Sequence, residues 1–137
     1  MADDKKQVEF QLVKNEGTVP PPDNLIAVTH GAVYPDIVKV TGAGDFKRGT
    51  LLMASGDSYV ASTKAGLSTA GSFCILCDDV TIGENEYAET AGYFQGEFND
   101  AKIIFPFETE EDDHDELIEL ARDYLRRSKI FLRHLHD

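Results

Sequence analysis

The chain has 137 residues, of which 42% are hydrophobic and 28% charged, so its length and composition are those of one ordinary ordered domain. Its 25 acidic and 13 basic side chains give a formal net charge of −12, which argues against a nucleic-acid partner because phosphate binding relies on Lys and Arg. The sequence contains no run of about 18 apolar residues, and its charged start has no apolar stretch behind it, so we expect neither a membrane span nor a signal peptide.

The first 24 residues differ from the rest and are predicted to form an extended N-terminal arm. Three consecutive prolines at positions 20–22 favour an extended conformation and donate no backbone hydrogen bonds. Before them, Val8, Phe10 and Leu12 alternate with polar residues, which places all three on one face of a short strand. This strand could pair with another molecule or be an ordinary edge strand of the same domain, and the sequence favours neither.

From residue 25 to residue 137 we expect a single β-rich domain. Short apolar or alternating runs are divided by turn residues at intervals of about ten, a pattern typical of all-β proteins. Gly, Asn and Asp in the connections at 42–45, 55–57 and 83–86 favour hairpins. The expected strands span residues 25–29, 37–40, 50–54, 58–61, 73–77, 87–94 and 103–107.

An amphipathic helix is predicted at about 110–127. Thr109 is the expected N-cap, and the carboxylates that lead the helix and the cations that follow match the helix dipole. A last strand is expected at 130–132, followed by a tail whose histidines, His134 and His136, we expect to be solvated. The apolar stripe of the helix consists of Leu117, Leu120, Ala121, Tyr124 and Leu125.

The candidate chemical motifs all favour structural roles. The glycine-rich turn at 42–45 lacks the strand-to-helix context of a nucleotide site. Cys74 and Cys77 have the spacing of redox and zinc sites, but residues three apart in a strand point to opposite faces, so we expect two free core thiols. Adjacent Asp78 and Asp79 also face opposite ways, one to the core edge and one to solvent, which disfavours a catalytic carboxylate pair. We therefore expect no catalytic residue, no metal ligand and no cofactor.

Three short segments occur in a characteristic order. Residues 47–52 read Lys-Arg-Gly-Thr-Leu-Leu, with a Gly-Asp turn at 56–57, and residues 75–80 read Ile-Leu-Cys-Asp-Asp-Val. Residues 96–99 read Gly-Glu-Phe-Asn and precede the helix and the closing strand. In this order and spacing they resemble the head decoration proteins of tailed bacteriophages, the lambda-type cement proteins. The resemblance covers about residues 31–132, while the acidic, proline-containing arm is longer than is usual there and the histidine-containing tail is additional.

The resemblance implies a β-clip-like fold with one helix and a homotrimer on the outside of an icosahedral capsid. The protein would then be made in the host cytoplasm and reside in the virion. The N-terminal arm, through Val8, Phe10 and Leu12, would add a strand to the major capsid protein. The family signature, with a structural or subunit-contact role, would consist of Gly96, Glu97, Phe98 and Asn99.

The implied function is mechanical, because a trimer that bridges neighbouring capsomers of the expanded head stabilises the shell against internal DNA pressure. One alternative is a trimeric spike or tail subunit that binds a host surface, which periodic fibre repeats or an aromatic-rich exposed loop would indicate. A second is a β-clip nucleotide hydrolase of the dUTP-cleaving type, which a Gly-Arg-Ser phosphate motif would indicate. The sequence shows no periodic fibre repeats, no aromatic-rich loop and no Gly-Arg-Ser motif.

Overall fold

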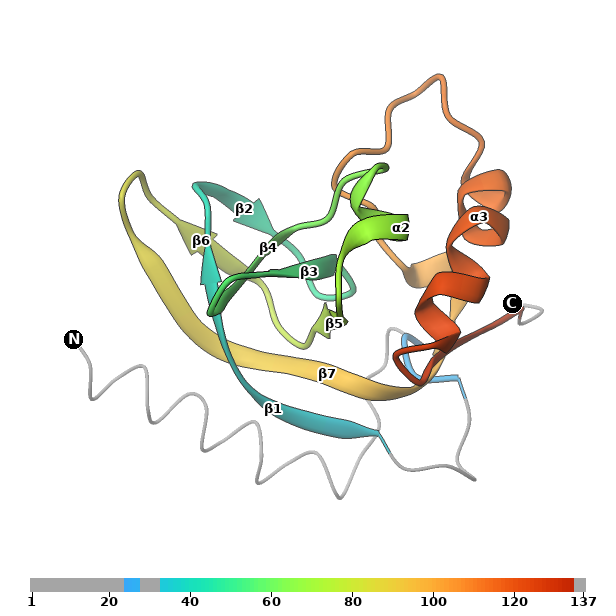
Figure 1. The fold of residues 1–137 in the computed structure, drawn as a ribbon, viewed down its shortest axis with the longest axis horizontal. Helices are drawn as coiled ribbons and strands as arrows, with labels where there is room; N and C mark the ends of the chain where they lie inside the picture. Colours follow the sequence, from blue (N-terminus) through green and yellow to red (C-terminus); the bar gives the residue numbers. More distant parts are fainter. Residues whose placement is uncertain (1–23, 28–32, 135–137) are drawn as a thin grey trace.

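The computed structural model describes residues 24–27 and 33–134, and most of its elements are strands (Figure 1). Val8, Phe10 and Leu12 of the predicted arm lie outside the described residues. In chain order the elements are β1 (Tyr34–Thr41), β2 (Gly44–Phe46), β3 (Leu51–Ser55), β4 (Ser58–Ala61), α2 (Gly66–Thr69), β5 (Phe73–Leu76), β6 (Val80–Ile82), β7 (Tyr87–Asn99), the 3-10 turn η1 (Asp100–Lys102), α3 (His114–Arg126) and β8 (Ile130–Arg133).

Five of the strands close into a small barrel-like sheet. β1 pairs with β7, β7 with β5, β5 with β3 and β3 with β4, all antiparallel. A single parallel pair, Val40 with Tyr59, joins β4 back to β1 and completes the ring. β2 and β6 form a separate two-stranded sheet. Figure 1 shows β7 as one long curved strand, and its last four residues leave the barrel and pair in parallel with β8.

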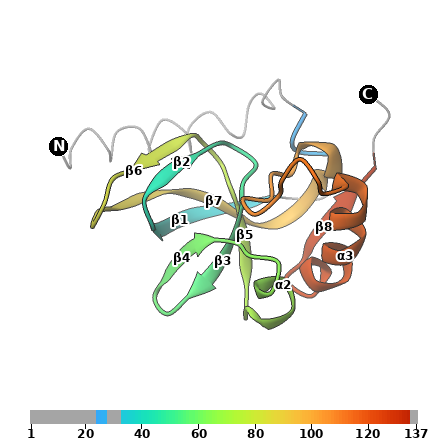
Figure 2. The ribbon, with the colours of Figure 1, turned by 90° about the horizontal axis from the view of Figure 1, so that it is seen from above.

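Strand alternation divides the buried side chains into two hydrophobic cores. In β5, Phe73 and Ile75 belong to one cluster, whereas Cys74 and Leu76 belong to the other. The cluster with Cys74 fills the barrel, and we call it the barrel core. The other lies between the outer face of the barrel and the C-terminal elements, and we call it the outer core; its members from those elements include Leu117, Ala121, Leu125, Ile130 and Leu132. Both ribbon views place α3 and β8 together at one end of the molecule (Figure 2).

The predicted mainly β fold with one C-terminal helix is confirmed. The strand predicted at 58–61 matches β4, and the hairpin turn at 55–57 joins β3 to β4 as expected. The turn at 42–45, by contrast, links β1 to β2, which pairs with β6, so that connection closes no hairpin. In the part of the chain that the model describes, no helix is both long and apolar enough to cross a membrane.

Two predicted strands differ from the structure. Residues 103–107 contribute one parallel bridge, Thr50 with Ile104, and form no strand, although Ile103 and Phe105 are buried as their alternation predicted. Of residues 25–29, Ile26 forms an isolated bridge with Phe98, and positions 28–29 lie outside the described residues. The β7 strand is five residues longer than expected, because it continues through Gly96 to Asn99.

The helix α3 begins later than predicted. Thr109 does not cap it; instead the N–H and hydroxyl of Thr109 both donate to Oδ2 of Asp112, which closes a separate turn. Asp113 is the N-cap, with its side chain accepting from the N–H of Asp115 at 3.0 Å. Beyond Arg126 the chain turns through Lys129 at φ 64°, which ends the helix and directs the chain into the predicted last strand.

Candidate functional site

Gly96 lies where β7 changes partners. Gln95 is the last β7 residue paired with β1, and Gly96 is the first paired with β8, opposite Ile130. Its φ of +147° is a conformation that L side chains rarely adopt, and an added Cβ would lie 2.5 Å from Cγ1 of Val33. Glycine therefore permits both the bend and the close approach that this exchange of partners requires.

The other three signature residues connect β7 to neighbouring segments of the same chain. Glu97 accepts a hydrogen bond from Nε of Arg133 on β8 at 2.7 Å. Phe98 is fully buried in the outer core, with its ring centroid 5.6 Å from that of Tyr93. Asn99 caps η1 by accepting from the N–H of Ala101 at 3.1 Å. The segment is thus structural within one chain, and a role in subunit contact stays a prediction.

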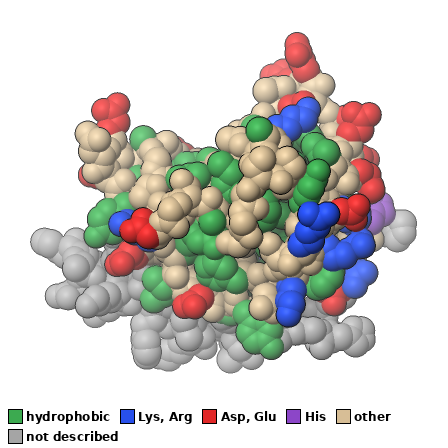
Figure 3. All heavy atoms as spheres, in the orientation of Figure 1, with side chains coloured by type: hydrophobic (Ala, Val, Ile, Leu, Met, Phe, Trp, Pro, Cys, Tyr) green, Lys and Arg blue, Asp and Glu red, His purple; other side chains and the backbone are tan. Residues whose placement is uncertain are grey.

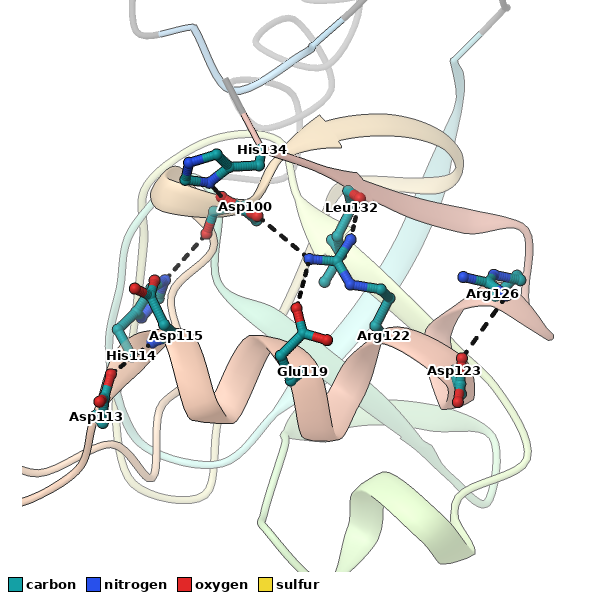
Figure 4. A network of polar contacts seen from close by, with 10 residues as sticks. All are labelled: Asp100, Asp113, His114, Asp115, Glu119, Arg122, Asp123, Arg126, Leu132 and His134. Atoms are coloured by element: carbon teal, nitrogen blue, oxygen red, sulfur yellow. Dashed lines mark hydrogen bonds and ion pairs between the residues drawn. The ribbon is translucent and has the colours of Figure 1, made fainter. Parts of the chain in front are cut away.

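Asp100, which follows the signature, is the centre of a polar network (Figure 4). Its residue is only 6% exposed, and its Oδ2 lies 3.4 Å from Nη2 of Arg122 on α3. Arg122 also donates to the carbonyl of Leu132 on β8 and to Oε2 of the exposed Glu119 at 3.2 Å. One guanidinium therefore ties η1, α3 and β8 together, and its partners compensate for the cost of partial burial.

Two histidines approach Asp100 from opposite sides in Figure 4. His134 was predicted to be a solvated tail residue; its side chain is 69% exposed, yet Nδ1 lies 3.5 Å from Oδ1 of Asp100. On the other side, Nε2 of His114 lies 3.0 Å from the backbone carbonyl of Asp100, and Nδ1 lies 3.0 Å from Oε1 of Glu108. The network thus links η1, α3, β8 and the loop before α3.

A hollow of about 230 Å³ opens beside this network. Its lining combines carboxylates with two basic side chains and one apolar residue, so it offers proton donors and acceptors but no hydroxyl or thiol nucleophile from the described residues. The lining residues are Asp100, Asp115, Ile118, Glu119, Arg122 and His134. Within residues 24–27 and 33–134, no three His, Cys, Asp or Glu side chains are grouped so as to hold a metal ion.

The sequence contained signals for this network that its interpretation missed. Arg122 follows Ile118 by four residues and precedes Leu125 by three, so a cation lies beside the apolar stripe of the helix, where it needs an anionic partner. Asp100 comes directly after a long strand that ends in the capping residue Asn99. The sequence does not show that these two positions, 22 residues apart, meet in space.

The cysteine pair and the aspartate pair considered in the sequence both have structural roles. Cys74 belongs to the barrel core and Cys77 to the outer core, so the expected opposite orientation of the two thiols is confirmed, and the two do not form a disulfide. Asp78 and Asp79 are both exposed, which corrects the expectation that one would turn to the core edge. Asp79 accepts from the N–H of Arg48 at 2.9 Å and so joins two loops.

The comparisons with known proteins give no assignment: no family model matches the chain, and a search of curated proteins finds no match.

Proposed function

We propose that this chain is a head decoration protein of a tailed bacteriophage, which acts as a homotrimer bound to the outside of the expanded capsid. The proposal is based on the resemblance of three sequence segments to that family. Its partner would be the major capsid protein, and its place in the particle the virion exterior. The chain would act by binding and bridging, with no reaction to catalyse.

The observation that carries the proposal is that the three segments are also neighbours in the fold. The guanidinium of Arg48, from the first segment, donates to the carbonyl of Cys77, from the second, at 2.7 Å. It also donates to the hydroxyl of Tyr93 at 3.1 Å, and the Tyr93 ring contacts Phe98 of the third segment. The three segments that carry the resemblance thus form one connected part of the fold.

The surface of the molecule gives further support. Tyr34 and Ile37 on β1 and Tyr87 on β7 are all more than half exposed. Large apolar side chains exposed on paired strands are typical of surfaces that contact another chain. Lys39 lies over the ring of Tyr87, with Nζ 4.8 Å from its centroid, so the apolar area has a charged border. Ile37 and Thr41, the residue opposite Tyr87, are four apart on β1, so Ile37 and Tyr87 share a face of the β1–β7 pair, which is a candidate for contact with a second subunit or with the shell.

The proposed mechanism is one of linked binding. A trimer that bridges neighbouring capsomers contacts a surface that exists only in the expanded shell, so its binding stabilises that state by mass action. An arm that adds a strand to the capsid protein would contribute main-chain hydrogen bonds, while alternate side chains of the arm give specificity. The alternating Val8, Phe10 and Leu12 are suited to that role.

The test is light scattering of the purified full chain, first alone and then with expanded, DNA-free heads of a lambda-type phage. We expect a particle of three times the 15.1 kDa chain mass that sediments with expanded heads and not with unexpanded ones. Removal of residues 1–24 should leave the trimer intact and abolish head binding. Phe10→Ser should weaken binding, whereas Gln11→Ser, on the opposite face of the same predicted strand, should not.

The alternative functions predict other results. A strictly monomeric chain that ignores expanded heads would refute the decoration role. A trimer that ignores heads but binds host cells would indicate a spike or tail subunit. Thermal stabilisation by a deoxynucleotide, with hydrolysis, would indicate the nucleotide hydrolase.

A further inference from the structure

His114, the first residue of α3, has a hydrogen-bond acceptor at each of its ring nitrogens; Figure 4 shows the side that faces Asp100. The backbone carbonyl of Asp100 can only accept a hydrogen bond, and so can the ionised carboxylate of Glu108. A neutral imidazole carries only one N–H. Both contacts can therefore be hydrogen bonds only when the pair formed by His114 and Glu108 holds one additional proton.

The surroundings of His114 favour the additional proton on this pair. The Phe105 ring packs on the imidazole with centroids 5.6 Å apart, and the guanidinium of Arg122 and the ring of His134 lie against the Asp100 carboxylate rather than against His114. The helix N-terminus opposes a positive charge at this position, but the nearby ionisable groups are acidic. The groups that act on the imidazole are Glu108 from the preceding loop, Asp115 beside it in the chain, and Asp100 through its carbonyl.

These contacts set the direction of the pKa shift. Partial burial by itself lowers the pKa of His114. The hydrogen bonds to Asp100 and Glu108, together with the charges of Glu108 and Asp115, outweigh it, so the pKa of His114 is raised above its ordinary value of 6.5. With a raised pKa in the folded state, the stabilisation from this group is complete below about pH 6.5 and is lost as the pH rises through the folded-state value.

The contact between His114 and Glu108 also fixes a loop. Residues 108–113 carry five carboxylates, and Figure 3 shows acidic side chains at the tip of the molecule above α3. Within this loop, Thr109 and Asp112 bond to each other and close a local turn. The side chain of Glu108 instead reaches forward to His114 at the start of the helix. This one contact therefore spans the acidic turn and holds its two ends together.

We propose that His114 and Glu108 form a proton-dependent clasp, which holds the acidic loop 108–113 against the start of α3 when protonated and releases it when the proton is lost. Loss of the proton leaves one ring lone pair facing an acceptor, either the carboxylate of Glu108 or the carbonyl of Asp100, and that contact is repulsive. The exposed acidic surface of the protein would then change its shape between mildly acidic and alkaline solution. A partner that recognises the docked loop would bind more weakly at alkaline pH.

The test is a nuclear magnetic resonance titration of the 15N-labelled full chain between pH 5 and pH 9. Ring nitrogen shifts report the protonation of His114, which the variant His114→Asn assigns, and backbone amide shifts report the loop. We expect both ring nitrogens to be protonated at low pH, a midpoint above 6.5, and the same midpoint for the amides of Glu108 and Thr109.

Glu108→Gln is the decisive variant, because a glutamine amide can accept from the charged ring and donate to the neutral ring. The midpoint of His114 should shift down, and the loop amides should lose their pH response. Glu110→Gln, which removes an exposed charge from the same loop, is the matched control and should retain most of that response. A His114 midpoint at or below 6.5, loop amides that do not titrate with it, or equal effects of the two variants would overturn the clasp.

Discussion

Single residues at the end of β7 determine how the C-terminal third of the chain attaches to the barrel. Gly96 provides the bend, Glu97 an ion pair, Phe98 a core contact and Asn99 a cap. The sequence predicted that these four residues belong together, since they resemble the signature of the proposed family. It indicated that Arg122 needs an anionic partner but not that this partner is Asp100, because helix and strand patterns describe single elements, whereas this partly buried ion pair joins two elements.

Gly96→Ala should destabilise the protein by about 1–3 kcal/mol, because the new Cβ meets Val33 and the backbone conformation is strained for any L side chain. Urea unfolding followed by circular dichroism would measure the loss. Gly71→Ala is the matched control: nothing lies within 4 Å of its added Cβ, and its effect should stay within about 0.5 kcal/mol. Similar midpoints for the two variants would contradict this account of Gly96.

At the scale of elements, periodicity predicted six of the observed strands, missed β2 and β6, and predicted two segments that, among the described residues, form isolated bridges only. The β4 strand was predicted at its observed bounds, since Gly56 and flanking polar residues delimit it. The predicted strand ended at residue 94, whereas β7 continues through Gly96, where it exchanges partners within one strand. Residues 103–107 alternate as a strand would, yet Ile104 bonds only to the short segment around Gly49 and Leu51. Whether such a segment forms a strand depends on its pairing partner, which alternation does not specify.

The start of α3 provides a test at this scale. Asp113→Ala should cost about 1 kcal/mol, because the side chain of Asp113 caps the first turn of the helix. Thr109→Ala should cost less, since Thr109 is exposed and bonds within the preceding turn. Thermal unfolding of the two variants by circular dichroism would rank them. A larger loss of stability in Thr109→Ala than in Asp113→Ala would indicate that Thr109 is the N-cap, as the sequence predicted.

The open side of β1 shows how an element can limit unwanted pairing. Among the described residues, β4 meets β1 only at Val40, so the edge between Tyr34 and Lys39 has no strand beside it. Pro35 has no N–H to offer there, and the N–H of Ile37 is taken by Oδ1 of Asp36 at 2.7 Å. Two donors two residues apart are thus removed from the edge, which discourages pairing with another strand.

At the scale of the whole molecule, the closed ring separates the interior into two compartments. The predicted apolar stripe of the helix is buried at Leu117, Ala121 and Leu125, but Leu120 is exposed. The division into two cores depends on β1 and β7 pairing across some fifty residues, a contact that local pattern does not contain. The barrel core lies within that ring, whereas the outer core is covered by α3, β8 and their connections. We therefore expect the outer core to open more readily than the barrel core.

The two cysteines allow this difference to be measured. Burial, followed by the charge of the neighbouring Cys77, raises the pKa of the Cys74 thiol and so suppresses its reactive thiolate. In variants that retain one cysteine each, made by Cys74→Ala and Cys77→Ala, an aromatic disulfide reagent should label the thiol of Cys77 faster than that of Cys74. Equal rates, both matching global unfolding, would show that the two compartments open together.

Because Cys74 on β5 faces the barrel core and Cys77, directly after β5, faces the outer core, oxidation has no short route to an internal cross-link. The labelling rate of each thiol instead reports how readily its own core opens. In a particle that carries many copies of this chain, one thiol reagent could therefore show whether the outer core of each subunit opens before the barrel core or together with it.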